Sequence, residues 1–133
     1  MQQINLVAAL VAGVIGFFPG ALWYSNLMFL PRWAREMGID LANPPAEKQR
    51  HGSKIAIGLG VSLVAAIVFA LIAGPAPVLD HSLLLALACA GLVGAAFAIQ
   101  YLFEGRSLAF WAINASYHLV QFLLFALVIG LWH

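Results

Sequence analysis

The sequence SLAFWAINASYHLVQFLLFALVIGLW, residues 107–132, contains no aspartate, glutamate, lysine or arginine. As an α-helix it rises about 1.5 Å per residue and exceeds the roughly 20 residues that cross about 30 Å of hydrocarbon. The segment nevertheless contains Asn114, His118 and Gln121, three strong hydrogen-bonding side chains. We therefore predict a transmembrane helix that turns these groups toward protein or a cavity, because lipid offers them no partner.

Three further runs lack charged residues and are long enough to span a bilayer. They cover residues 4–30, 55–79 and 81–103. In the second run, Gly74, Pro75 and Pro77 end the helix near Ala73. We predict an all-α polytopic membrane protein that forms a single domain of residues 1–133, with four transmembrane helices at about 4–30, 55–74, 81–103 and 107–132.

The composition excludes a water-soluble protein. Of 133 residues, 64% are hydrophobic and 8% are charged, whereas an ordinary soluble domain has about 25% charged residues. Membrane lipids are therefore the expected surroundings. The net charge is +1 and the sequence has no basic block, which argues against nucleic-acid binding. Cys89 is the one cysteine, so no internal disulfide bond can form.

The basic residues predict the orientation in the membrane. All six lie in the connections between the first and second helices and between the third and fourth helices: Arg32, Arg35, Lys48, Arg50, Lys54 and Arg106. The positive-inside rule places both connections in the cytoplasm and both termini outside. Aromatic residues at the helix ends fit interfacial belts, namely Trp23, Tyr24, Trp33, Trp111 and Trp132.

The first connection, residues 31–54, predicts a short amphipathic helix on the cytoplasmic surface. Pro31 suits its start and Gly38 its end. Further along, Asn43 before a proline resembles an N-cap, so the second transmembrane helix can begin in the cytoplasm. Glu47 and His51 are one turn apart, but two ligands are too few for a metal site. We predict no metal, and basic side chains here that face lipid headgroups.

The three polar residues of the fourth helix form a stripe. Asn114, His118 and Gln121 stand at i, i+4 and i+7, which places them on one helical face. His118 lies eleven residues beyond Ser107, about 17 Å into the membrane. Counting inward from the cytoplasmic ends places Tyr24 and Ser62 near the level of Asn114. Pro19 falls near His118 and displaces the carbonyl of Ile15, for which Gln121 or His118 is at a suitable depth to donate.

Two interpretations of the stripe compete. In the first, its side chains only form hydrogen bonds between helices, each worth about 0.6 to 2 kcal/mol. In the second, His118 lines a polar cavity, where it carries a proton or contacts a bound molecule. Catalysis finds little support, because Ser116 lies on another helical face than His118, and Glu104 has a natural ion-pair partner in Arg106. We therefore predict neither catalytic residues nor a cofactor.

Small residues at four-residue spacing indicate close helix packing. The third helix has four of them and the first two helices have two each: Ala86, Ala90, Gly94 and Ala98; Gly16 and Gly20; Ala56 and Gly60. The main interpretation is packing within the bundle. The alternative is that the third helix contacts a second copy of the chain, which predicts a homo-oligomer.

Two segments resemble a known family: GALWYSNLMFLPRWAREMGI, residues 20–39, and FEGRSLAFWAINASYHLVQFLL, residues 103–124. With the four-span layout, their motifs LWYS, RSL and INASYHL are similar to the domain-of-unknown-function 1761 family of small bacterial membrane proteins. The resemblance implies a four-helix membrane module with no established activity. In a bacterial inner membrane, the orientation predicted from the basic residues makes both termini periplasmic. It draws attention to Trp23, Tyr24, Ser25, Asn114, Tyr117 and His118.

We predict binding or transport of a small molecule or proton at an intramembrane pocket between the first and fourth helices. Its candidate residues are Asn114, His118, Gln121, Trp23, Tyr24, Ser25, Ser62 and Tyr117. Two other classes of function stay open: an interaction subunit of a membrane complex, and a small membrane enzyme that acts on a lipid or a quinone.

Overall fold

The computed structural model describes residues 3–42 and 51–132, and these residues form helices without strands. The helices are α1 (Leu6–Phe17), α2 (Pro19–Trp23), α3 (Leu30–Met37), α5 (His51–Ala73), α6 (Leu79–Glu104) and α7 (Leu108–Leu131). Four segments are long and apolar enough to cross a membrane: Leu6–Trp23, Gly52–Ala73, Leu79–Glu104 and Leu108–Leu131. The predicted all-α membrane fold is confirmed.

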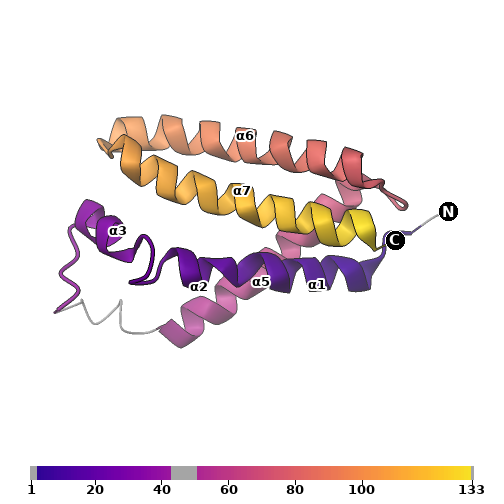
Figure 1. Ribbon diagram of the computed structural model, residues 1–133, viewed down its shortest axis with the longest axis horizontal. Coiled ribbons are helices and arrows are strands. Elements are labelled where there is room, and N and C mark those ends of the chain that lie inside the picture. Colours follow the sequence, from indigo (N-terminus) through magenta and orange to yellow (C-terminus); the bar gives the residue numbers. More distant parts are fainter. Residues whose placement is uncertain (1–2, 43–50, 133) are drawn as a thin grey trace.

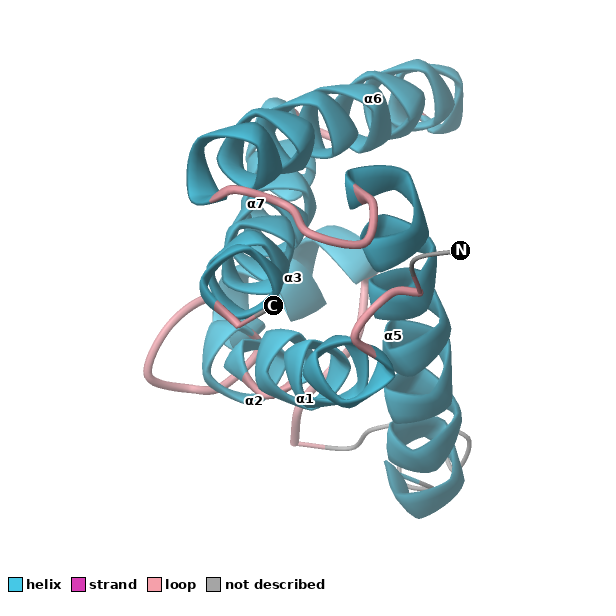
Figure 2. Ribbon diagram, turned by 90° about the vertical axis from the view of Figure 1, so that its right-hand side faces the viewer, coloured by secondary structure: helices cyan, strands magenta, loops and turns pink. Residues whose placement is uncertain are grey.

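The four spanning segments contact one another in the order α6, α7, α1 and α5. Helices α6 and α7 form an antiparallel hairpin, and α1 packs against both α7 and α5. By contrast, α5 and α6 contact each other at few positions, because α5 crosses the bundle obliquely and diverges from α6 (Figure 1). Seen along the bundle, α7 lies between α6 and α1, with α5 beside α1 (Figure 2).

The first spanning segment is shorter than predicted and is interrupted. We predicted one helix to residue 30, but α1 ends at Phe17, and the five-residue α2 ends at Trp23. Pro19 explains the interruption, because it has no N–H to donate to the turn before it. Beyond Trp23 the chain forms turns up to Phe29, although its sequence there is still apolar.

Helix α3 agrees with the prediction for the first connection. Pro31 lies in its first turn, and Gly38 ends it with a left-handed φ of 71° that favours glycine. Helix α5 begins at His51, before the charge-free run. The predicted N-cap at Asn43 and the Glu47–His51 pair lie outside the described residues.

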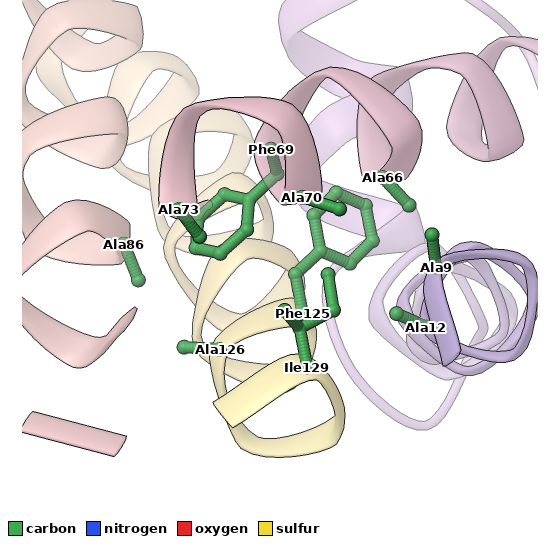
Figure 3. Close-up of a cluster of buried hydrophobic side chains, with 10 residues drawn as sticks. All are labelled: Ala9, Ala12, Ala66, Phe69, Ala70, Ala73, Ala86, Phe125, Ala126 and Ile129. Atoms are coloured by element: carbon green, nitrogen blue, oxygen red, sulfur yellow. The ribbon is translucent and has the colours of Figure 1, made fainter. Parts of the chain in front are cut away.

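A cluster of alanines and three large side chains forms the core near the ends of the bundle that hold the termini (Figure 3). Phe69 of α5 and Phe125 of α7 meet edge to face with ring centroids 5.9 Å apart. Alanines surround them and let the helices approach closely: Ala9, Ala12, Ala66, Ala70, Ala73, Ala86 and Ala126. Around the outside, large apolar side chains such as Leu92 are exposed, as expected of a lipid-facing surface.

The small-residue stripes are confirmed in part. Ala86 and Gly94 of α6 are buried, and the Gly94 carbonyl accepts a hydrogen bond from Trp111 Nε1 of α7 at 2.8 Å. At these two positions the stripe serves the contact inside the chain, whereas Ala98 is exposed. Ala56 and Gly60 of α5 are exposed, so our prediction that they pack against another helix of the bundle was wrong. The homo-oligomer stays a prediction.

The α6–α7 turn is attached to α3 at the end of the bundle opposite the termini (Figure 1). Arg106 donates from Nη1 to the carbonyl of Glu36 at 3.1 Å and covers the Phe110 ring at 5.1 Å. Arg106 thus bonds to the Glu36 carbonyl in place of the predicted ion pair with Glu104. Glu36 pairs instead with Arg32 at 2.9 Å. Hydrogen bonds from the Ser107 hydroxyl, and from Arg32, hold the pKa of Glu36 below its ordinary value.

Candidate functional site

The polar stripe of α7 faces the interior of the bundle. Asn114 and Gln121 are 8% and 7% exposed, and His118 between them is half-buried. Tyr117, on the neighbouring face, is also buried. Burial of these groups costs free energy unless they find partners, and two separate hydrogen-bond networks supply them.

The first network joins three helical segments at Asn114. The Tyr24 hydroxyl, at the end of α2, donates to Asn114 Oδ1 at 2.6 Å. Asn114 Nδ2 donates to the Tyr101 hydroxyl oxygen of α6 at 3.2 Å. The indole of Trp23 fixes α2 on α7 by donating from Nε1 to the carbonyl of Ile113 at 3.0 Å. Tyr24 therefore lies at the level of Asn114, as the depth count predicted.

The second network lies deeper, and the donor and acceptor of each of its hydrogen bonds can be assigned. Ser62 Oγ donates to the Gly13 carbonyl at 2.8 Å, and this donation uses its single hydrogen. Ser62 must therefore accept from Gln121 Nε2, which lies at 3.3 Å. Gln121 Oε1 then points to His118 Nδ1, 2.8 Å away, and an amide oxygen can only accept. His118 consequently carries a proton on Nδ1.

The direction of the second network leaves Nε2 of a neutral His118 with a lone pair. Within residues 3–42 and 51–132, this nitrogen makes no hydrogen bond to a protein group. The same network corrects the depth count for Ser62, which lies at the level of Gln121 rather than of Asn114.

Tyr117 stabilises the break in the first spanning segment. Its hydroxyl lies 3.2 Å from the carbonyl of Phe17 and 3.4 Å from that of Gly16, next to Pro19. We predicted Gln121 or His118 as the donor to the carbonyl of Ile15. The oxygen and the nitrogen of the Gln121 side-chain amide both bond elsewhere. Tyr117, one turn nearer to α2, contacts the carbonyls of Gly16 and Phe17 and not that of Ile15.

A cavity of about 370 Å³ lies beside the first network. Its lining combines polar groups with aromatic rings from four helical segments: Tyr24, Trp33, Phe97, Tyr101, Asn114 and His118. On the other side of His118 a cleft of about 540 Å³ runs between α5 and α6 over α7. His118 and Phe97 line both spaces, and their ring centroids are 5.4 Å apart.

The structure brings three predicted site residues to the cavity, namely Tyr24, Asn114 and His118. Gln121, Ser62 and Tyr117 line the adjoining cleft. Trp23 does not line the cavity and instead bonds to the backbone carbonyl of Ile113. The Ser25 hydroxyl donates to the carbonyl of Leu22 in its own turn at 2.6 Å.

Three lining residues were missing from the predicted site: Trp33, Phe97 and Tyr101. A signal for two of them existed. An antiparallel hairpin that turns at Gly105 brings residues on either side of the turn opposite each other. Phe97 and Tyr101 therefore fall opposite the stripe. Trp33 had no such signal, because its position depends on the turns after Trp23.

The chemistry available at this site is hydrogen bonding and aromatic contact. Ser116 Oγ donates to the carbonyl of Ile113 on its own helix, away from His118. Among the residues that the structure describes, no three metal-ligating side chains of the His, Cys, Asp or Glu type lie together. The lining of the cavity contains neither an acidic nor a basic residue other than His118.

Comparison with known proteins gives one match. A family described as "Protein of unknown function (DUF1761)" matches residues 7–130, which takes in the four spans except for their outermost residues. No curated protein and no solved structure matches the chain.

Proposed function

Since the chain belongs to the DUF1761 family, whose description names no activity, we propose from the site itself that this membrane protein binds a small molecule in the cavity beside His118. The observation that carries the proposal is the set of polar groups around the cavity. Tyr24, Tyr101, Asn114 and His118 come from three helical segments and meet around a space of about 370 Å³. Ligand cavities of roughly 300–1,000 Å³ with a few convergent polar groups are typical binding sites.

A purely structural stripe would use its hydrogen-bonding capacity between helices. Gln121 and Ser62 fit that role, because they link α7 to α5 and α1. His118 does not, because its ring lines the cavity and its Nε2 makes no hydrogen bond to the part of the protein that the structure describes. An unused acceptor inside a membrane costs free energy unless a ligand or water satisfies it. This difference favours binding over a role confined to packing.

The packing at the opposite end of the bundle favours binding over conduction. Phe69, Phe125 and the surrounding alanines fill the space between the cavity and the termini (Figure 3). This packing supports a molecule that is held in the cavity over one that moves along the bundle toward the termini. A proton path is also poorly supported, because His118 has no carboxylate neighbour in the cavity lining.

The orientation that we propose places the cavity toward the cytoplasm. Arg32 and Arg35 lie in α3, and Arg106 bonds to the Glu36 carbonyl of α3. Helix α3 lies at one end of the bundle and the termini lie at the other (Figure 1). By the positive-inside rule the arginine end is cytoplasmic, which makes both termini periplasmic in a bacterial inner membrane. Tyr24 and Trp33 then line the cytoplasmic side of the cavity.

Replacement of His118 by alanine tests the proposal. We expect the apparent affinity for the ligand, measured from ligand-induced stabilisation, to fall roughly tenfold. The reason is the loss of one hydrogen bond of about 1.4 kcal/mol. The unliganded protein should lose about 1–2 kcal/mol of stability, because Gln121 Oε1 loses its donor while Gln121 Nε2 keeps its bond to Ser62. The measurement is thermal unfolding of purified protein with a bacterial lipid extract and with a panel of neutral small molecules.

The control for His118→Ala is His81→Ala, since His81 is an exposed histidine at the start of α6. Unchanged ligand protection with a lower unfolding temperature would contradict the proposal and favour a structural stripe. Partner chains that copurify would favour an interaction subunit. Turnover of a lipid or quinone would favour an enzyme.

A further inference from the structure

The hydrogen-bond network at Asn114 leaves a donor on Tyr101. Asn114 Nδ2 donates to the Tyr101 oxygen at 3.2 Å, so the Tyr101 hydrogen points elsewhere. Within residues 3–42 and 51–132, the Tyr101 hydroxyl donates no hydrogen bond to a protein acceptor. Since Tyr101 lines the cavity, its hydroxyl is available as a donor to a molecule there.

His118 supplies the complementary group. Its Nδ1 is held as a donor by the chain through Gln121 and Ser62 to the Gly13 carbonyl, so Nε2 of the neutral ring is an acceptor. One donor and one acceptor thus line the same cavity. The hydroxyl group of a ligand can satisfy both at once, because it donates one hydrogen and accepts through its lone pairs.

Charged ligands fit this lining poorly. Neither the cavity nor the cleft is lined by aspartate, glutamate, lysine or arginine. A carboxylate or an ammonium group would therefore lose its hydration without gaining an ionic partner. A carboxylate would in addition face the lone pair of His118 Nε2. The lining selects a neutral group.

The cleft beside His118 is suited to an apolar chain. Phe17, Val61, Ala65 and Val93 contribute to its walls, and it lies between α5 and α6, which contact each other at few positions. Val61 is 63% exposed on the outer side of α5, so the cleft opens to the surface that faces lipid. A molecule can therefore reach His118 sideways from the bilayer.

We propose that the ligand is a neutral, hydroxyl-bearing amphiphile of the membrane, with its hydroxyl between His118 Nε2 and Tyr101 and its apolar part in the α5–α6 cleft. The inference rests on the proposed function and gives it a ligand class. It explains why the polar cavity and the apolar cleft are both lined by the imidazole ring of His118.

A matched pair of photoreactive probes tests this inference. The first is a long-chain alcohol with a diazirine near the far end of the chain, and the second is its methyl ether, which accepts a hydrogen bond but cannot donate one. Protein reconstituted in lipid nanodiscs is labelled with each probe below saturation, and the labelled residues are mapped by mass spectrometry.

We expect the alcohol to label the cleft residues Val61, Ala65, Val93 and Phe97 about tenfold more than the ether does, because the ether loses one hydrogen bond. Leu84, which is 65% exposed on α6, reports general contact with the bilayer and should be labelled equally by both probes. Tyr101→Phe and His118→Leu should reduce cleft labelling by the alcohol, and the matched variant His81→Leu should not.

The comparison of the two probes on the unmodified protein does not depend on whether any variant folds. Equal cleft labelling by alcohol and ether, or stronger labelling by the corresponding fatty acid or alkylamine, would overturn the inference. The proposed function would survive that result if a water-soluble neutral molecule still stabilised the protein in a His118-dependent manner. It would fail if neither class of molecule did.

Discussion

Replacement of Gly13 by leucine is expected to destabilise the bundle more than any other single change to α1 or α5. A Cβ on Gly13 would lie 2.8 Å from Leu63 Cα and 3.2 Å from Leu63 N of α5, and backbone atoms cannot rotate away. The helices would have to separate, which also breaks the bond from Ser62 to the Gly13 carbonyl. Overpacking costs about 1–3 kcal/mol, and the lost hydrogen bond adds about 1 kcal/mol.

Thermal unfolding in detergent measures this effect, with an expected decrease of about 10 °C or more. Gly60→Ala is the matched control, because a Cβ at Gly60 on α5 meets no atom within 4 Å. We expect Gly60→Ala to be neutral or slightly stabilising, since alanine favours a helix by about 1 kcal/mol over glycine. An unfolding temperature that Gly13→Leu leaves unchanged would show that α1 and α5 are not in contact there.

Replacement of Asn114 by leucine is expected to abolish binding and to loosen three helical segments together. The change removes the acceptor of the Tyr24 hydroxyl and the donor to Tyr101 in one step. It also places an apolar side chain at the wall of the cavity. We expect a loss of about 2–3 kcal/mol, because two partly buried hydroxyl groups lose a partner.

A double-mutant cycle separates this network from general packing. Tyr24→Phe, Asn114→Leu and the double variant are compared by unfolding, and we expect a coupling energy of about 1 kcal/mol between the two positions. Ser25→Ala is the control partner, because the Ser25 hydroxyl bonds only within its own turn. Additive effects of Tyr24→Phe and Asn114→Leu would contradict the contact.

The spans were predictable because hydrocarbon excludes charge. Helices α6 and α7 begin and end within two residues of the predicted bounds, since Asp80 and Glu104–Arg106 mark the limits of the apolar runs. The end of the first span at Trp23 was not predictable in the same way. The residues after Trp23 are still apolar, and hydropathy cannot distinguish a helix from the turns that bring Tyr24 to α7.

The part of the site that lies on a single helix, α7, was predictable. The spacing of Asn114, His118 and Gln121 alone indicates one inward face, and their burial agrees with it. Partners on other helices depend on how far each helix slides along its neighbour. Ser62 reaches Gln121 rather than Asn114 because Gly13 lets α1 and α5 approach at that level. Such contacts depend on the packing of several helices and cannot be predicted from the sequence of one helix.

The protonation of His118 tests the central claim most directly, because one ring nitrogen reports the whole chain from Gln121 through Ser62 to the Gly13 carbonyl. The measurement is nitrogen NMR of histidine-labelled protein in bilayers at neutral pH, with the His118 signals assigned by their loss in His118→Gln. The account predicts a neutral ring with its proton on Nδ1, and release of this preference in Gln121→Leu. A proton on Nε2 with a bare Nδ1, unaffected by Gln121→Leu, would show that the stripe does not face the bundle as described.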